Sequence, residues 1–144
     1  MREDRSAAYA AFVLRISLAY FFAAHLYVKF AILGVDAWWS SLEKAGYAAW
    51  VPYYTVAAEF AGAILLLLGI YSRYVALLAL PVLIAVTRHW AIRKGLWFVD
   101  GGAEFPLAWT LMLVVQAILG DGAFAVKVPA PPWERRPAAM MAGE

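Results

Sequence analysis

The sequence predicts an all-α integral membrane protein, a four-helix bundle with a short interfacial helix between the first and second spans. The composition is 65% hydrophobic and only 15% charged, and the mean hydropathy is +0.71. Four apolar runs are near 20 residues long, the length that crosses about 30 Å of hydrocarbon. The runs are rich in Ala and Leu and lack the apolar/polar alternation of barrel strands, so helices are expected.

The predicted spans cover residues of about 8–34, 51–70, 74–92 and 103–120. The first run is too long for a secretory signal and has no convincing cleavage site, so it is expected to stay as a span. Only residues 71–73 join the second and third runs, which forces an antiparallel hairpin. Gly69, just before that turn, suits the end of a helix. Residues 1–122 are therefore expected to form one transmembrane domain.

The segment between the first two spans is too polar to cross a membrane but is rich in aromatic residues. Such rings collect at the level of the lipid headgroups. A short helix lying along the outer surface is therefore expected there. The aromatic residues of this segment include Trp38, Trp39, Trp50, Tyr53 and Tyr54.

The distribution of Lys and Arg predicts the orientation in the membrane. An even number of spans puts both termini on one side. That side carries six Lys and Arg residues outside the spans, and the opposite side carries three. By the positive-inside rule both termini, with the Pro-rich tail of residues 123–144, are expected in the cytoplasm. The net charge of +2 is mild and forms no basic stripe, so no nucleic-acid partner is indicated.

Ionisable residues inside the spans are the candidate functional residues, because a charge at mid-bilayer costs roughly 2.5 to 3.5 kcal/mol. With each span centred in the bilayer, six of them fall in the outer half. Glu59 is at nearly the depth of His25, so these two are expected to be neighbours. Two cations then face two anions, and the cluster is formally neutral. The six residues are His25, Lys29, Glu59, Arg88, His89 and Glu104.

Arg15 is set apart on the inner half of the first span. At about 100° per residue, it shares one helix face with His25 and Lys29, the face that a bundle would bury. Gln116 is the nearest polar residue in depth. A structural role is therefore expected for Arg15, with hydrogen bonds to Gln116 and to backbone carbonyls.

The outer cluster has two main interpretations. One is a buried ion-pair network that sets helix register. The other is a ligand site, in which the histidines bind a quinone carbonyl or exchange its protons, Glu59 carries protons, and Lys29 or Arg88 stabilises a semiquinone or a sulfur oxyanion. A haem held by His25 and His89 is less favoured, because no attachment motif is present. Glu104 also suits the first turn of a helix, where the helix dipole favours an acid.

The order and spacing of these residues resemble the DoxX family, over about residues 12–120. The family pattern has Arg, His and Lys in the first span, Glu followed by small residues in the second, and a turn with Arg. A His near the end of the third span and a Gly-Gly-x-Glu-aromatic-Pro motif follow. The matching residues are Arg15, His25, Lys29, Glu59, Gly62, Gly69, Arg73, His89, Gly101, Gly102, Glu104, Phe105 and Pro106. Ala19 and Leu26 replace glycines of the pattern, and Arg88 lies outside it.

The resemblance implies a small four-helix protein of the bacterial inner membrane, associated with sulfur or redox physiology. One branch of the family resembles the small subunit of thiosulfate:quinone oxidoreductase. The expected function is therefore a subunit or partner of a membrane oxidoreductase that binds quinone. The alternative is a non-catalytic structural or assembly subunit of a larger membrane complex. A transporter ranks last, because inverted repeats and broken spans are missing.

The expected partners are the lipid bilayer and other membrane subunits. The absence of cysteine excludes dithiol chemistry and thiolate-held iron–sulfur clusters. The sequence shows no flavin fold and no clear set of metal ligands, so no intrinsic cofactor is expected. A partner or a bound quinone would have to supply the centre that accepts electrons.

Overall fold

The computed structural model describes residues 2–129 and residue 131, with side chains from residue 5 onward. Within this range the chain is helical and contains no strand, which confirms the prediction of an all-α fold. Five α-helices are accompanied by two π-helical segments and one 3-10 turn. In chain order the elements are α1 (Arg2–Tyr27), the π segment η1 (Val28–Leu33), α2 (Val35–Lys44), α3 (Val51–Ala61), the π segment η2 (Gly62–Leu66), α4 (Ser72–Lys94), the 3-10 turn η3 (Phe98–Asp100) and α5 (Glu104–Leu119).

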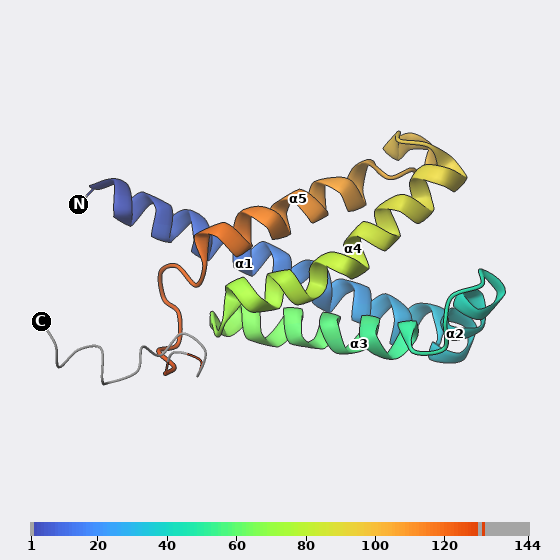
Figure 1. Ribbon diagram of the computed structural model, residues 1–144, viewed down its shortest axis with the longest axis horizontal. Coiled ribbons are helices and arrows are strands. Elements are labelled where there is room, and N and C mark those ends of the chain that lie inside the picture. Colours follow the sequence, from blue (N-terminus) through green and yellow to red (C-terminus); the bar gives the residue numbers. More distant parts are fainter. Residues whose placement is uncertain (1, 130, 132–144) are drawn as a thin grey trace, which may run out of the picture.

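The helices pack as two antiparallel pairs. The first pair is α1 with α3 and η2, and the second is α4 with α5 (Figure 1). The pairs are packed together toward the end where the chain begins and diverge toward the end that carries α2 and η3. The connections at these two ends of the bundle differ, because the turn between η2 and α4 is short and the links through α2 and η3 are longer.

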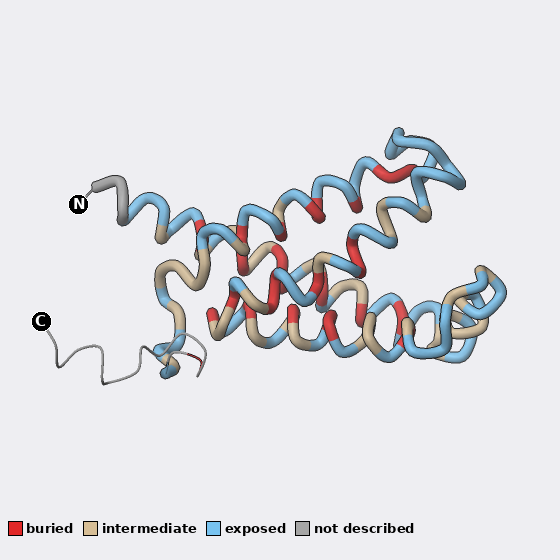
Figure 2. The backbone as a smooth tube through the Cα atoms, in the orientation of Figure 1, coloured by how far each residue is buried: buried red, intermediate tan, exposed pale blue. Residues whose placement is uncertain are grey.

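The apolar core lies where the two pairs meet. Buried positions follow the facing sides of the helices, and few of them lie near α2 (Figure 2). Gly62 brings η2 close to α1, since a Cβ at this position would lie 2.3 Å from the ring of Phe22. The close approach therefore depends on glycine. The largest apolar side chains of the core are Leu18, Phe22, Leu66, Leu83, Trp109 and Leu113.

Apolar side chains also cover the outside of the bundle. Two helices, Arg5–Leu33 and Ser72–Lys94, are long and apolar enough to cross a membrane. Only 28% of the most apolar window in each is buried, whereas the core helix of a soluble protein would be mostly covered. An apolar exterior around buried polar groups is typical of a membrane protein. Exposed apolar side chains include Tyr20, Ile64, Leu77, Ile84, Leu111 and Ile118.

The other two apolar helices, Val51–Leu66 and Glu104–Leu119, are shorter. At 16 residues, α5 is about 24 Å long. The predicted spans 51–70 and 103–120 fall on these two helices. The predicted span 74–92 falls on α4, and the span 8–34 falls on α1 with η1.

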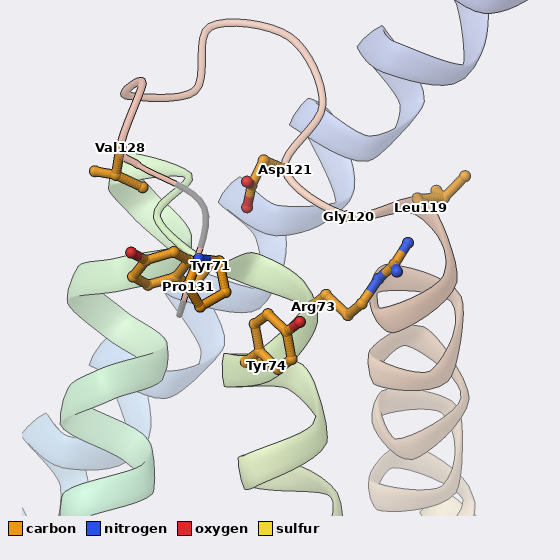
Figure 3. A pocket seen from close by; sticks show the side chains of 8 residues that line it. All are labelled: Tyr71, Arg73, Tyr74, Leu119, Gly120, Asp121, Val128 and Pro131. Carbon is orange, nitrogen blue, oxygen red and sulfur yellow. The ribbon is translucent and has the colours of Figure 1, made fainter. Parts of the chain in front are cut away.

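The segment after α5 contains neither helix nor strand up to residue 129, but it is held against the bundle. Asp121 accepts a hydrogen bond from the backbone N–H of Ser72 at 2.6 Å and so caps the start of α4. Figure 3 shows Asp121 near this first turn and Arg73 extending toward the end of α5. Further hydrogen bonds fix the segment, among them Ala123 N to Ala8 O (2.9 Å), Val126 N to Leu68 O (3.0 Å) and Tyr71 Oη to Pro129 O (2.8 Å). The rest of the predicted tail lies outside the described residues.

Candidate functional site

A cavity of about 680 Å³ lies between the two helix pairs, at the end where they diverge. Residues from α1, η1, α2, α3, α4 and α5 line it, together with the loops at this end. Its volume is within the range of pockets that hold small organic ligands. Most of the lining is aliphatic or aromatic. Its polar residues include His25, Lys29, Tyr47, Glu59, His89 and Trp109.

An ion pair between Lys29 and Glu59 joins the first two long helices at the cavity. The Nζ of Lys29 donates to Oε1 of Glu59 at 2.6 Å, and the two residues are only 7% and 4% exposed. The ammonium also lies 5.1 Å from the ring centre of Trp38 on α2, a cation–π distance. Lys29 is in the first turn of η1, and π-helical turns are frequent at functional sites. The pair is formally neutral and holds the start of η1 against α3.

Two buried polar atoms at this cavity lack a hydrogen-bond partner among the described residues. They are Oε2 of Glu59 and Nε1 of Trp109, and both residues line the cavity. Trp109 is only 3% exposed. Nearly all buried polar groups in proteins are hydrogen-bonded, so an unpartnered pair at one cavity needs an explanation. One atom accepts and the other donates, and both lie within the wall of the cavity and not on its open surface.

Both histidines line the cavity, and each has one ring nitrogen engaged. Nδ1–H of His25 donates to the carbonyl of Phe21 at 3.2 Å, which leaves Nε2 as an acceptor in the neutral ring. The His25 ring also packs edge-on against Trp109, with the ring centres 4.8 Å apart. Nδ1 of His89 shares a 2.9 Å hydrogen bond with the hydroxyl of Tyr47. This bond links the loop between α2 and α3 to α4.

Two residues of the expected cluster lie elsewhere. Arg88 is exposed, does not line the cavity, and has no hydrogen bond or ion pair to any described residue. One residue along a helix is a turn of about 100°, so His89 faces the cavity and Arg88 does not. Glu104 is also exposed, and its Oε2 accepts a hydrogen bond from the N–H of Phe98 at 3.0 Å. The expected group of two cations and two anions is therefore reduced to the Lys29–Glu59 pair.

Arg15 is buried at the opposite end of the bundle, away from the cavity. It is 1% exposed, and it donates to the carbonyls of Leu66 and Leu67 at 2.8 and 2.7 Å and to that of Ala123 at 2.9 Å. The first two are carbonyls at the end of the second long helix, and that of Leu66 also accepts a hydrogen bond from the N–H of Gly69 at 3.2 Å. Gly69, at φ +71°, makes room for the guanidinium, since a Cβ there would lie 2.9 Å from its central carbon.

Gln116 does not pair with Arg15 in the described structure. It is buried, and its Nε2 donates to the carbonyl of Gly120 at 2.6 Å, so it caps the end of its own helix. The expected backbone partners of Arg15 are present, and the expected side-chain partner is engaged elsewhere.

Trp109 and Tyr47 are not among the candidate site residues that the sequence predicts. Trp109 carried a usable signal, because a tryptophan well inside an apolar span is unusual when most lie at the membrane surface. Tyr47 carried none, since it is one of several aromatic residues in a polar loop. Among the described residues, no three His, Asp or Glu side chains are grouped as metal ligands.

The DoxX family model matches residues 10–93, more than half of the chain. The match covers Arg15, both histidines and the Lys29–Glu59 pair. No curated protein and no solved structure matches the chain. The resemblance found in the sequence motifs is thereby confirmed, and the chain belongs to the DoxX family.

Proposed function

We propose that this protein is a quinone-binding membrane subunit that works with a redox partner. The observation that carries the proposal is the cavity of about 680 Å³, whose mostly apolar lining includes the hydrogen-bonded pair of Tyr47 and His89. A quinone head is a flat apolar ring with oxygens at its edges. Such a head matches a mostly aromatic and aliphatic lining with a few polar groups that fix its orientation.

The proposed placement in the membrane makes the cavity accessible to a lipid-soluble ligand. The four long helical segments cross the bacterial inner membrane, both termini are cytoplasmic, and α2 and η3 lie at the outer surface. The excess of Lys and Arg on the terminal side and the tryptophans around α2 support this orientation. The cavity then lies in the outer half of the bilayer, within reach of quinones dissolved there.

The role proposed for this chain is to bind and orient the quinone, with electrons exchanged through another protein. The chain contains no cysteine, so it cannot supply thiolate-held clusters or a dithiol. Tyr47 or His89 would donate to a ligand oxygen, and the Lys29–Glu59 pair would fix the part of the wall where α3 meets η1. A partner subunit would bring the redox centre to this cavity.

A direct binding measurement tests the proposal. The full chain in lipid nanodiscs is titrated with decylubiquinone, and the bound fraction is measured by equilibrium dialysis. Tyr47→Phe keeps an aromatic ring and removes the hydroxyl, so the affinity should fall about three- to tenfold, the effect of one neutral hydrogen bond. Tyr20→Phe is the matched control, because Tyr20 is exposed and does not line the cavity. Wild-type protein without saturable binding would refute the proposal.

The second candidate is a non-catalytic assembly subunit. Large aromatic side chains that are exposed near α2 and η3 favour it, because such groups are enriched at protein interfaces. They include Trp50, Tyr53, Trp97 and Phe98. Co-purification with an oxidoreductase, combined with no quinone binding in the isolated chain or in the complex, would favour this role.

A further inference from the structure

We infer that the quinone enters the cavity sideways from the lipid, between α3 and α4, and that the hydroxyl of Tyr54 holds this entrance closed. The inference rests on the proposed function and on the proposed placement in the membrane. It concerns the route into the cavity, whereas the proposed function concerns the groups that hold the ligand there. A quinone is apolar enough to dissolve in the bilayer, so an entrance that faces lipid is the route it needs.

The two helix pairs meet along two seams, one between α1 and α5 and the other between α3 and α4. The seam between α1 and α5 is closed by aromatic rings. Phe21 packs edge-on against Phe105 and Trp109, with ring centres 5.5 and 5.7 Å apart. The ring of Phe22 lies 4.9 Å from that of Trp109, and Trp109 is only 3% exposed. This side of the cavity is therefore covered.

The seam between α3 and α4 is bridged by two tyrosine hydroxyls. Tyr54 of α3 donates to the carbonyl of Leu78 at 2.6 Å. Tyr47, in the loop that leads into α3, shares its 2.9 Å hydrogen bond with His89. Leu78 and His89 are about three helical turns apart, so they lie on one face of α4. Because both contact the α3 side of the bundle, this face of α4 is turned toward α3.

The part of α4 between these two hydrogen bonds is poorly covered. Pro81 and Ala85 lie on the same helix face, and they are exposed although they line the cavity. Both side chains are small, in contrast to the rings of the other seam. Pro81 has no N–H, so α4 lacks the backbone hydrogen bond to the carbonyl of Leu77, and helices bend at such positions. Release of the Tyr54 hydroxyl would therefore let α4 bend away from α3 beside the cavity.

A single engineered thiol can report this opening, because the chain contains no cysteine. Val86→Cys places the thiol on α4, at a half-buried position that lines the cavity. The full chain in lipid nanodiscs is treated with a lipid-soluble maleimide and, separately, with a membrane-impermeant one. Adding Tyr54→Phe should speed the lipid-soluble reaction about three- to tenfold, the effect of one neutral hydrogen bond on the open fraction. The impermeant reaction should not change.

Tyr53→Phe is the matched control for this labelling. Tyr53 is the neighbouring residue on α3, it is exposed, and it does not line the cavity. The same hydroxyl is lost, but no contact between α3 and α4 is broken. The labelling rate of Val86→Cys should therefore be the same with Tyr53→Phe as without it.

Exchange of decylubiquinone tests the entrance with the ligand itself. If the ligand passes the same seam on entry and on exit, Tyr54→Phe should raise the association and dissociation rate constants by one common factor, about three- to tenfold. The dissociation constant should then stay unchanged. Loss of a group that only holds the ligand would raise the dissociation constant instead. Phe21→Leu, which loosens the other seam, should leave both rate constants unchanged.

The outcomes separate this inference from the proposed function. Equal labelling rates with and without Tyr54→Phe, or faster labelling by the impermeant reagent alone, overturn the inferred entrance. Faster exchange of decylubiquinone in Phe21→Leu than in Tyr54→Phe places the entrance at the other seam and overturns it as well. Faster lipid-soluble labelling in Tyr54→Phe without any binding of decylubiquinone supports the entrance and overturns the proposed function.

Discussion

Replacing Arg15 by methionine should strongly destabilise the fold. The guanidinium makes three hydrogen bonds of 2.7 to 2.9 Å to the carbonyls of Leu66, Leu67 and Ala123. A hydrogen bond from a charged donor contributes about 1.5 to 3 kcal/mol, so a simple sum for three is about 4.5 to 9 kcal/mol. The cost of burying the guanidinium offsets part of this sum, and methionine refills the apolar volume of the stem. We therefore expect a loss of about 4 kcal/mol in the free energy of unfolding.

The free energy of unfolding is measured by titrating the protein with denaturing detergent in mixed micelles and following its helicity. Arg15→Lys keeps the charge but has one nitrogen and cannot reproduce the planar fork, so its loss should be intermediate. Arg73→Met is the matched control, because Arg73 is exposed and makes only a long 3.4 Å contact to the carbonyl of Ile118. If Arg15→Met lies within about 1 kcal/mol of the control, the carbonyl contacts do not stabilise the bundle as argued.

Three further predictions concern stability, each measured by the same detergent titration. Removing either Lys29 or Glu59 alone leaves a buried charge and should lower the free energy of unfolding by about 3 to 5 kcal/mol. The double variant Lys29→Met with Glu59→Gln should lower it clearly less. A loss in the double variant equal to the sum of the two single losses would contradict a direct pair. Gly62→Ala should cost about 1 to 3 kcal/mol, because the new Cβ meets the ring of Phe22, and a neutral result would show that the ring moves aside freely. Asp121→Ala should cost about 0.5 to 2 kcal/mol through loss of the cap on α4, whereas Asp121→Asn should retain most of it; equal losses would contradict capping.

The helical framework was predictable because it depends on the length and composition of the apolar runs. Helix depth also placed His25 and Glu59 at nearly the same level, with Lys29 closer to the outer surface, since the first two long helices are antiparallel. The choice of Lys29 as the partner of Glu59 was not predictable from depth. Lys29 lies in the π-helical segment that begins at Val28, whose turn differs from the α-helical spacing from which depth and face were worked out.

The positions of Arg88 and Glu104 show a second limit of reasoning by depth. Arg88 and His89 are adjacent in sequence and nearly equal in depth, and only the rotation of α4 decides which one faces the cavity. Glu104 is the first residue of α5, where the backbone N–H of Phe98 offers a nearby donor. A side chain at a helix end finds a local partner more readily than one across the bundle. The alternative noted for Glu104, an acid suited to the first turn of a helix, agrees with this position.

The contacts of Arg15 also bear on the order in which the protein can be completed. Its three acceptors lie 51, 52 and 108 residues further along the chain. During synthesis the first helix therefore exists before any of them, and its guanidinium must be satisfied by water, lipid or other proteins in the meantime. The last of the three bonds forms only after α5 and the residues that follow it have been made. The hydrogen bonds of Arg15 are therefore completed only when the segment around Ala123 has been made. A chain truncated before that segment would keep an incompletely bonded arginine.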